Sequence, residues 1–202
     1  MLADGTADTV LRAALAAPDR SMASLARRLR STPLLASVVA VLDEVDESGG
    51  DKDSHMAVVS MVNERGERGL LAFTGVDSLS AWNPAARPVP AVGRDIARSA
   101  KAEGAAAVIV DVVGPSTAVF AARDLDVLAD LLDLSAVTRA VHELLGEVRV
   151  HDARSASDDA DVLVEVAADQ VSPAARALAA DPGILRLVPG GIGVIAAGSM
   201  DL

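Results

Sequence analysis

The residues that could bind a divalent metal ion or move a proton gather in one polar segment, HDARSASDDAD. His151 and Asp152 open this segment, and Asp158, Asp159 and Asp161 close it. Carboxylate oxygens and imidazole nitrogens bind divalent cations, and a histidine beside a carboxylate can act as a general base. The same composition is typical of a solvated acidic loop, which is the interpretation that we favour. These five residues form the candidate polar site.

Other motifs for catalysis each lack a required residue. His142 lies in VHELL, which has no second histidine one turn later, so the zinc-binding HExxH pattern is not formed. The glycine-rich PGGIG at 189–193 lacks the following helix and the Lys-Ser/Thr of a phosphate-binding loop. No G-x-S-x-G elbow occurs, and the chain has no cysteine. We therefore expect no cofactor and no metal, and we assign no catalytic residue.

Acidic residues leave one kind of chemistry open. The chain has 29 Asp and Glu, so a carboxylate pair of the glycosidase type remains an alternative. The complete lack of tyrosine argues against a sugar site, because such sites usually offer aromatic platforms. The acidic segment 43–54 does not follow the spacing of a calcium-binding loop.

Phe73 and Trp82 are candidate interface residues. Together with Phe120 they are the only aromatic residues of the chain, and Trp82 stands at the end of a short expected helix. A tryptophan at this place most often packs its helix onto a sheet, which is the interpretation that we favour. Tryptophan is also enriched at the centres of protein interfaces, so an anchor for a partner or a second copy is the alternative.

Composition and charge narrow the class of protein. Hydrophobic residues make up 51% of the 202 residues, which is enough for a buried core built from Ala, Val and Leu. The net charge of -11 argues against nucleic acid and against anionic membranes, although 27–30 holds three arginines. No stretch reaches the roughly 20 apolar residues of a membrane helix, and the N-terminus lacks the pattern of a signal peptide. We expect a cytoplasmic protein.

Helical and strand patterns alternate along the chain. Helices are expected at 6–17 with Thr6 as N-cap, and at 21–29, 74–82, 93–103, 124–132 and 135–145. Strands are expected at 34–42, 56–63, 68–73, 105–112 and 117–121, with hairpins at 56–73 and 105–121. Towards the end we expect strands at 148–150, 162–167, 185–188 and 193–197, the last two as a hairpin, and a helix at 172–180.

This order predicts an α+β fold with a central mixed sheet, flanking helices and a smaller C-terminal αβ unit. We expect N-terminal helices over 1–32, an α+β domain over 33–146 and a small αβ unit over 147–202. The strand at 105–112 is the most apolar, so we place it centrally.

Two motifs carry a family resemblance. In LLAFTGVDSLSAW (70–82) a strand ends in Phe-Thr and a short helix carries a tryptophan, and GAAAVIVDVVGPSTAVF (104–120) follows. VVAVLDEVDE (38–47) and DKDSHMAVVSM (51–61) are similar to actinobacterial sequences of the same kind. On these motifs residues 33–132 resemble the SseB family, named for enhanced serine sensitivity in bacteria. Members often have Asn-Pro where this chain has Asp111-Val112. The resemblance implies no established active site.

We therefore expect a non-enzymatic, SseB-like protein-interaction or regulatory protein, whose partner is another protein or a second copy. The alternative is a small-molecule-binding protein or an enzyme with an unrecognised carboxylate/His site. A second alternative is a secretion-system-associated protein, although the chain lacks the long apolar helices of a translocon component.

Overall fold

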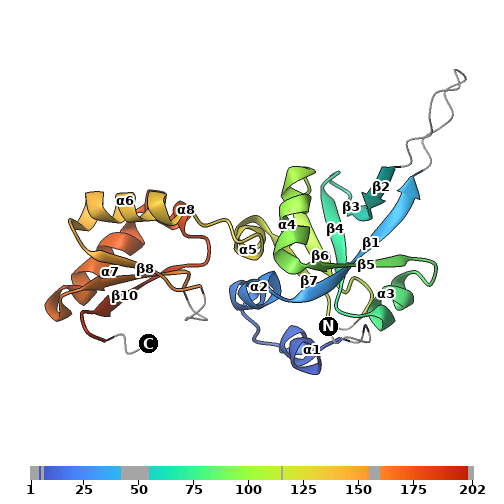
Figure 1. The fold of residues 1–202 in the computed structure, drawn as a ribbon, viewed down its shortest axis with the longest axis horizontal. Helices are drawn as coiled ribbons and strands as arrows, with labels where there is room; N and C mark the ends of the chain where they lie inside the picture. Colours follow the sequence, from blue (N-terminus) through green and yellow to red (C-terminus); the bar gives the residue numbers. More distant parts are fainter. Residues whose placement is uncertain (1–4, 6, 42–54, 115, 155–159, 200–202) are drawn as a thin grey trace, which may run out of the picture. The chain divides into compact units, whose positions relative to one another are not determined.

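The computed structural model describes residues 5, 7–41, 55–114, 116–154 and 160–199, and it divides into two compact units (Figure 1). The first unit is Met1–Ala129 and the second is Asp130–Leu202. Both combine helices with a sheet, which confirms the predicted α+β class. The sequence placed the start of the last unit at 147. In the structure the helix before that point already packs into the second core.

The first unit holds a seven-stranded mixed sheet and its flanking helices. The helices are α1 (Thr9–Ala16), α2 (Met22–Arg30), α3 (Val76–Trp82), α4 (Gly93–Ala102) and α5 (Ala122–Leu128). The strands are β1 (Pro33–Val41), β2 (His55–Val58), β3 (Ser60–Val62), β4 (Arg68–Phe73), β5 (Arg87–Val92), β6 (Ala107–Val110) and β7 (Ala118–Ala121).

Strand pairing confirms the predicted hairpins and the central strand. The main strand order is β2-β1-β4-β6-β7, with β3 on β4 and β5 on β1. Both β3–β4 and β6–β7 pair antiparallel, as expected for hairpins. β4 and β6 pair in parallel, and β6 lies between β4 and β7, so it is an interior strand. The carboxyl ends of β4 and β6 therefore lie at the same edge of the sheet.

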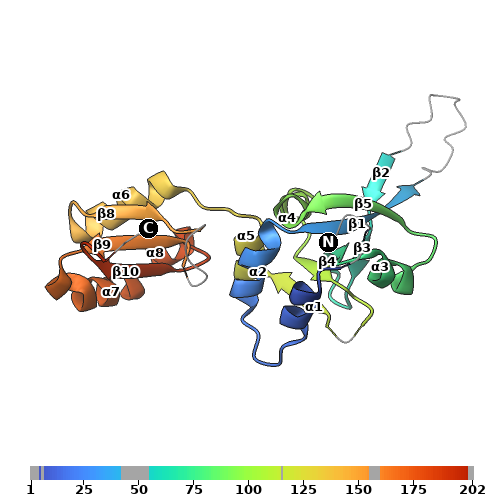
Figure 2. The same ribbon diagram turned by 60° about the horizontal axis from the view of Figure 1, so that its bottom comes forward.

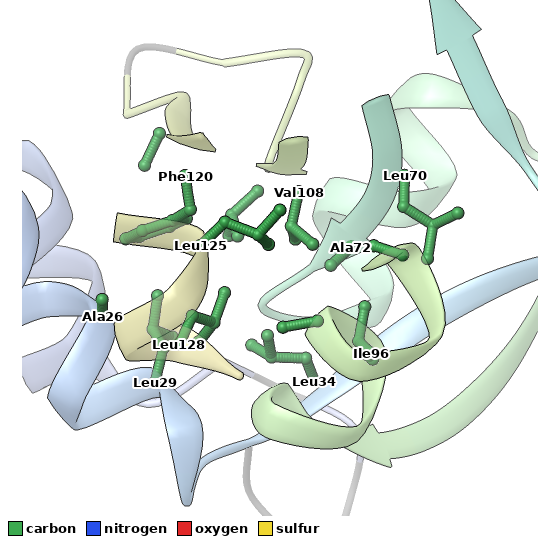
Figure 3. Close-up of a cluster of buried hydrophobic side chains, with 14 of the residues drawn as sticks. Ala26, Leu29, Leu34, Leu70, Ala72, Ile96, Val108, Phe120, Leu125 and Leu128 are labelled. Atoms are coloured by element: carbon green, nitrogen blue, oxygen red, sulfur yellow. The ribbon is translucent and has the colours of Figure 1, made fainter. Parts of the chain in front are cut away.

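One face of this sheet carries the main core (Figure 3). Leu70, Val108 and Phe120 point from neighbouring strands towards leucines and alanines of α2, α4 and α5. The N-terminal helices belong to the same core, since Leu11 of α1 and Leu29 of α2 are fully buried in it. Leucine and alanine make up most of this cluster, and the alanines let the helices approach the sheet closely.

The N-terminal helices begin at side-chain caps. Asp8 accepts hydrogen bonds from the backbone nitrogens of Val10 and Leu11 and so caps α1. The expected cap Thr6 lies outside the described residues. Ser21 Oγ accepts from the backbone nitrogen of Ser24 and so caps α2.

The second unit is a three-stranded sheet with its helices on one face. Its elements are α6 (Leu134–Leu145), β8 (Arg149–Asp152), β9 (Val162–Val166), the short 3-10 helix η1 (Ala168–Gln170), α7 (Val171–Ala180), α8 (Pro182–Leu187) and β10 (Ile192–Ala196). The strands lie in the order β10-β9-β8, side by side in Figure 2. Val137 of α6, Leu178 of α7 and Ile184 of α8 pack against Val162 and Val164 of β9.

Two sequence predictions in the second unit are wrong. Residues 182–187 form the helix α8 instead of a strand at 185–188, because Asp181 caps the backbone nitrogens of Gly183 and Ile184 and Pro182 fits the first helical turn. The strand at 192–196 does not form a hairpin with it. It pairs in parallel with β9, across a connection that contains α7 and α8.

Candidate functional site

His151 of the candidate polar site faces a glutamate on the neighbouring strand. Its Nε2 lies 3.0 Å from Oε2 of Glu165, and Arg149 donates to Oε1 of the same carboxylate over 3.3 Å. The backbone nitrogen of Gly198 also donates to Oε1 over 3.3 Å. Strand alternation explains the grouping, because Arg149 pairs with Glu165 in register and His151 is two residues further along.

These contacts keep Glu165 in its charged form. The pKa of Glu165 is lowered, first by the hydrogen bond from His151 and then by the Gly198 amide and Arg149. A carboxylate held ionised in this way accepts hydrogen bonds and orients the imidazole. Sequence reasoning named His151 but missed Glu165. The alternating pattern of VLVEV, with a glutamate between buried valines, was the available signal.

Asp152 lies in a separate ion-pair network. The Arg154 guanidinium binds Asp152, with Nη2 2.6 Å from Oδ2, and also lies 2.9 Å from Asp130 Oδ1. These two carboxylates raise the pKa of Arg154. The network ties the first residue of the second unit to the end of β8, so Asp152 has a local structural role.

Asp161 is buried beside a glycine turn. It is 2% exposed, its carbonyl accepts from the backbone nitrogen of Ala153, and a Cβ built on Gly190 would overlap its carboxylate. Asp158 and Asp159 lie outside the described residues. Within the described part of the chain, no three His, Cys, Asp or Glu side chains come together as a metal site. His151, Asp152 and Asp161 therefore do not converge, and a polar site that includes the loop stays a prediction.

Phe73 and Trp82 pack against each other in the first unit. Their ring centroids are 5.5 Å apart at an interplanar angle of 34°. Phe73 has no exposed surface, whereas Trp82 is half-buried. With Leu71 and Leu79 they form a small cluster on the sheet face opposite the main core. This cluster attaches α3 to the sheet, and an interface role of Trp82 stays a prediction.

Among the described residues, no helix other than α3 covers that sheet face. Figures 1 and 2 show α3 on the opposite side of the sheet from α2 and α5. In register across the strands, Leu71 pairs with Ile109 and Ile109 with Val119. Exposure rises along this row, from fully buried Leu71 to Val119 at 50%. Met61, paired with Gly69 in the next row, is 44% exposed.

We call Met61, Ile109, Val119 and Ala121 the open-face patch. All four point to the same face, because their register partners share it. The Ile109 side chain leans over Gly69, where a Cβ would lie only 2.6 Å from its Cδ1. Glycine at this position thus lets β6 and β3 present a continuous apolar surface. The sequence alone does not indicate this surface, because pairing across strands is a tertiary property.

A buried aspartate stands where the parallel strands β4 and β6 end. Asp111 follows β6, is 6% exposed and has φ 50°, in the left-handed region. Its carbonyl accepts from Thr117 Oγ1 over 2.7 Å. Ligands of α/β sheets often bind beyond such strand ends. Here Gly5 and Ala7 lie beside this edge, since the Gly5 carbonyl accepts from the backbone nitrogen of Val76 and Ala7 lies against Gly75.

An ion pair joins two helices of the first unit. Arg12 of α1 lies 2.5 Å from Asp77 of α3, and this pairing lowers the pKa of the Asp77 carboxyl.

The arginines at the end of α2 do not form an exposed basic stripe. Arg27 and Arg30 are each 8% exposed, and only Arg28 is exposed. In addition, none of the helices within the described ranges is both long enough and apolar enough to cross a bilayer.

The second unit also has a groove between two helices. Ala140, Glu143 and Leu144 of α6 line one side, and Ile184 and Leu187 of α8 with the cap Asp181 line the other. A shallower depression along α6 alone is lined by Ser135, Thr138, Arg139 and His142 among others. His142 Nε2 lies 2.8 Å from the carbonyl oxygen of Val148, so this histidine ties the end of α6 to the next loop.

Fold and surfaces together define an α+β protein, and the candidate sites among the described residues are an open sheet face in the first unit and a groove between helices in the second. The family model described as SseB protein N-terminal domain matches residues 8–126, which is more than half of the chain. The chain therefore belongs to the SseB family. No curated protein and no solved structure matches it.

Proposed function

We propose that this SseB-family chain is a non-enzymatic interaction protein whose first unit associates with a second copy of itself. The open-face patch is the observation that carries the proposal. Met61 and Val119 are 44% and 50% exposed, and half-buried Ile109 lies in the register row of Val119. Neighbouring apolar side chains left on a folded domain mark interaction sites more often than scattered ones do.

The lack of charge in the open-face patch is compatible with a second copy on this face. The chain carries a net charge of -11, so two copies repel each other over most of their surface. The four side chains of the open-face patch carry no charge, and a two-fold interface brings the same patch together from both copies. An uncharged patch is therefore self-complementary.

The two outer strands of the sheet, β5 and β7, differ in their ability to pair with an added strand. Pro88 and Pro90 lie in β5, and their missing N–H groups remove donors that an added strand would need. β7, which carries Val119 and Ala121, has no proline. The contact can therefore extend from the open face onto β7. Trp82 packs on the same cluster as Ile109 and would lie at the margin of this interface.

The proposal places the protein in the cytoplasm, in keeping with a sequence without cysteine. Sedimentation of the full chain tests the association. The wild type is expected to dimerise at concentrations on the order of 100 μM or below. Val119→Asp should be monomeric because it places a charge in the interface. Val62→Asp is the matched control, since Val62 is 60% exposed on β3 and points to the other face.

Two results would overturn the proposal. One is a wild-type chain that sediments only as a monomer over the whole concentration range. The other is a dimer that Val119→Asp and Val62→Asp weaken equally, because the contact would then not use the open face.

A further inference from the structure

The groove between α6 and α8 has an apolar floor and one exposed apolar wall. Ile184 is 2% exposed at the bottom, and Ala140 and Leu187 are half-buried beside it. Leu144 stands at the edge with 41% of its surface exposed. Gly183 lines the groove at the start of α8, and because it has no side chain it does not fill the groove there. Leu144 would lose water contact if an apolar side chain entered beside it.

Carboxylates border this floor on both helices. Glu143 of α6 is exposed, and no ion pair of Glu143 occurs within the described part of the chain. Asp181 caps α8 through Oδ1, which lies 2.8 Å from the Gly183 nitrogen and 3.0 Å from that of Ile184. One acidic group therefore stands on each side of the apolar floor.

The charge of the whole second unit has the same sign. Residues 130–202 contain twelve Asp and Glu against five Arg, with no lysine. A field of this sign attracts cationic partners and speeds their encounter. An anionic or uncharged partner gains nothing from it.

We infer that this groove binds an amphipathic helical segment of another protein, with apolar anchors flanked by lysine or arginine. The apolar floor would receive the anchors at helical spacing, and Glu143 and Asp181 would pair with the flanking cations. The groove has a volume of about 420 Å³ but is open along its length, so it suits a segment of chain better than an enclosed small molecule. This inference concerns the second unit and does not depend on dimerisation of the first.

A designed peptide tests the inference on the full chain. The probe is a fluorescein-labelled helical peptide of about 15 residues, with leucines spaced i, i+4 and i+7 and lysines flanking them. Saturable binding by anisotropy is expected, with amide shifts of Ile184 and Leu187 in NMR spectra. A peptide with glutamates in place of the lysines, and one with alanines in place of the leucines, should each bind at least about tenfold more weakly.

Variants of the protein locate the site. Leu144→Ala and Glu143→Lys should each weaken binding of the lysine peptide by about fivefold to tenfold. Glu147→Lys is the matched control, because Glu147 makes the same charge change at a side chain that is 94% exposed and outside the groove. It should change the affinity less than about twofold. Circular dichroism confirms that each variant remains folded.

Three outcomes would overturn the inference. The first is no saturable binding, and the second is equal binding of the lysine and glutamate peptides. The third is an equal loss in Glu143→Lys and Glu147→Lys, which would show attraction by overall charge alone. Val119→Asp should bind the peptide normally, so failure here is distinguishable from failure of the proposed dimer.

Discussion

Thr74 donates two hydrogen bonds to the side chain of Asp111. The Thr74 backbone nitrogen donates to Oδ1 over 2.9 Å, and Thr74 Oγ1 donates to Oδ2 over 2.6 Å. Thr74 follows β4 and Asp111 follows β6, so the pair joins the ends of two parallel strands. Thr74 is fully buried, and these contacts satisfy polar groups that would otherwise be stranded in the core.

Replacing Asp111 by alanine should destabilise the first unit strongly. Thr74 would lose both acceptors while buried, and alanine is disfavoured at the φ of 50° found here. We expect a loss of about 2–4 kcal/mol in the free energy of unfolding, measured with urea. Asp111→Asn is the matched control, because asparagine tolerates this conformation, accepts from the backbone nitrogen and can donate to Thr74 Oγ1. If the alanine variant were as stable as the asparagine variant, the pair would not hold the strands.

Trp82 offers a second test of packing in the first unit. Trp82→Ala removes the ring that contacts Phe73 and leaves a gap between α3 and the sheet. Because Trp82 is only half-buried, we expect the free energy of unfolding to fall by about 1–3 kcal/mol. Urea unfolding monitored by circular dichroism measures this loss. Trp82→Phe keeps an aromatic contact and should lose less.

The same variant separates the two roles considered for Trp82. A destabilised chain that still associates supports packing alone. A chain of unchanged stability that no longer associates contradicts the packing role and makes Trp82 an interface anchor.

Local signals in the sequence predicted much of the first unit. Hydrophobic patterning identified the β3–β4 and β6–β7 hairpins. It also identified the helix α4, which was expected at 93–103 and spans Gly93–Ala102. These features depend on residues close together in the chain. Asp181-Pro182 is also a local signal, for the start of a helix, and the strand prediction at 185–188 overlooked it.

The candidate sites were harder to predict because strand register creates them. Nothing in the sequence pairs His151 with Glu165, or Ile109 with Val119, until the sheet aligns them. The loop carboxylates suggested a shared site by proximity in sequence, whereas Asp152 turns to Arg154 and Asp161 packs beside Gly190. Proximity along a polar loop says little about where its side chains point.

Titration of Glu165 gives a pH-dependent prediction. Its pKa in the folded chain lies below the ordinary value of 4.5, so the folded state favours the ionised carboxylate. Ionised Glu165 therefore contributes its full stabilisation of the folded state at pH values above its ordinary pKa. This stabilisation is lost as the pH falls through the lowered pKa of the folded state. The carboxyl carbon shift of Glu165, followed by NMR, should show a midpoint below 4.5.

Two variants resolve the causes of this shift. His151→Ala should move the Glu165 midpoint upwards, because the hydrogen bond from His151 is the largest cause of the lowered pKa. Arg149→Ala should move it upwards by less, since the Arg149 side chain is 77% exposed and its effect is screened. A midpoint that does not respond to His151→Ala would contradict the geometry of the pair.

Gly190 and Asp161 predict a coupled pair of substitutions in the second unit. A Cβ at residue 190 would overlap the buried Asp161 carboxylate, so Gly190→Ala must displace that side chain or the turn at 189–191. We expect a loss of about 2–4 kcal/mol for Gly190→Ala in urea unfolding. Asp161→Ala should also destabilise the chain, since Asp161 is 2% exposed and directly precedes β9.

The double variant distinguishes overlap from general damage. With alanine at 161 the carboxylate that the new methyl group meets is gone, so the double variant should be more stable than the sum of the single losses by about 1–2 kcal/mol. Strict additivity would mean that the two residues do not meet. The coupling then measures how closely the turn at 189–191 is built around the carboxylate of Asp161, which is buried in the second unit.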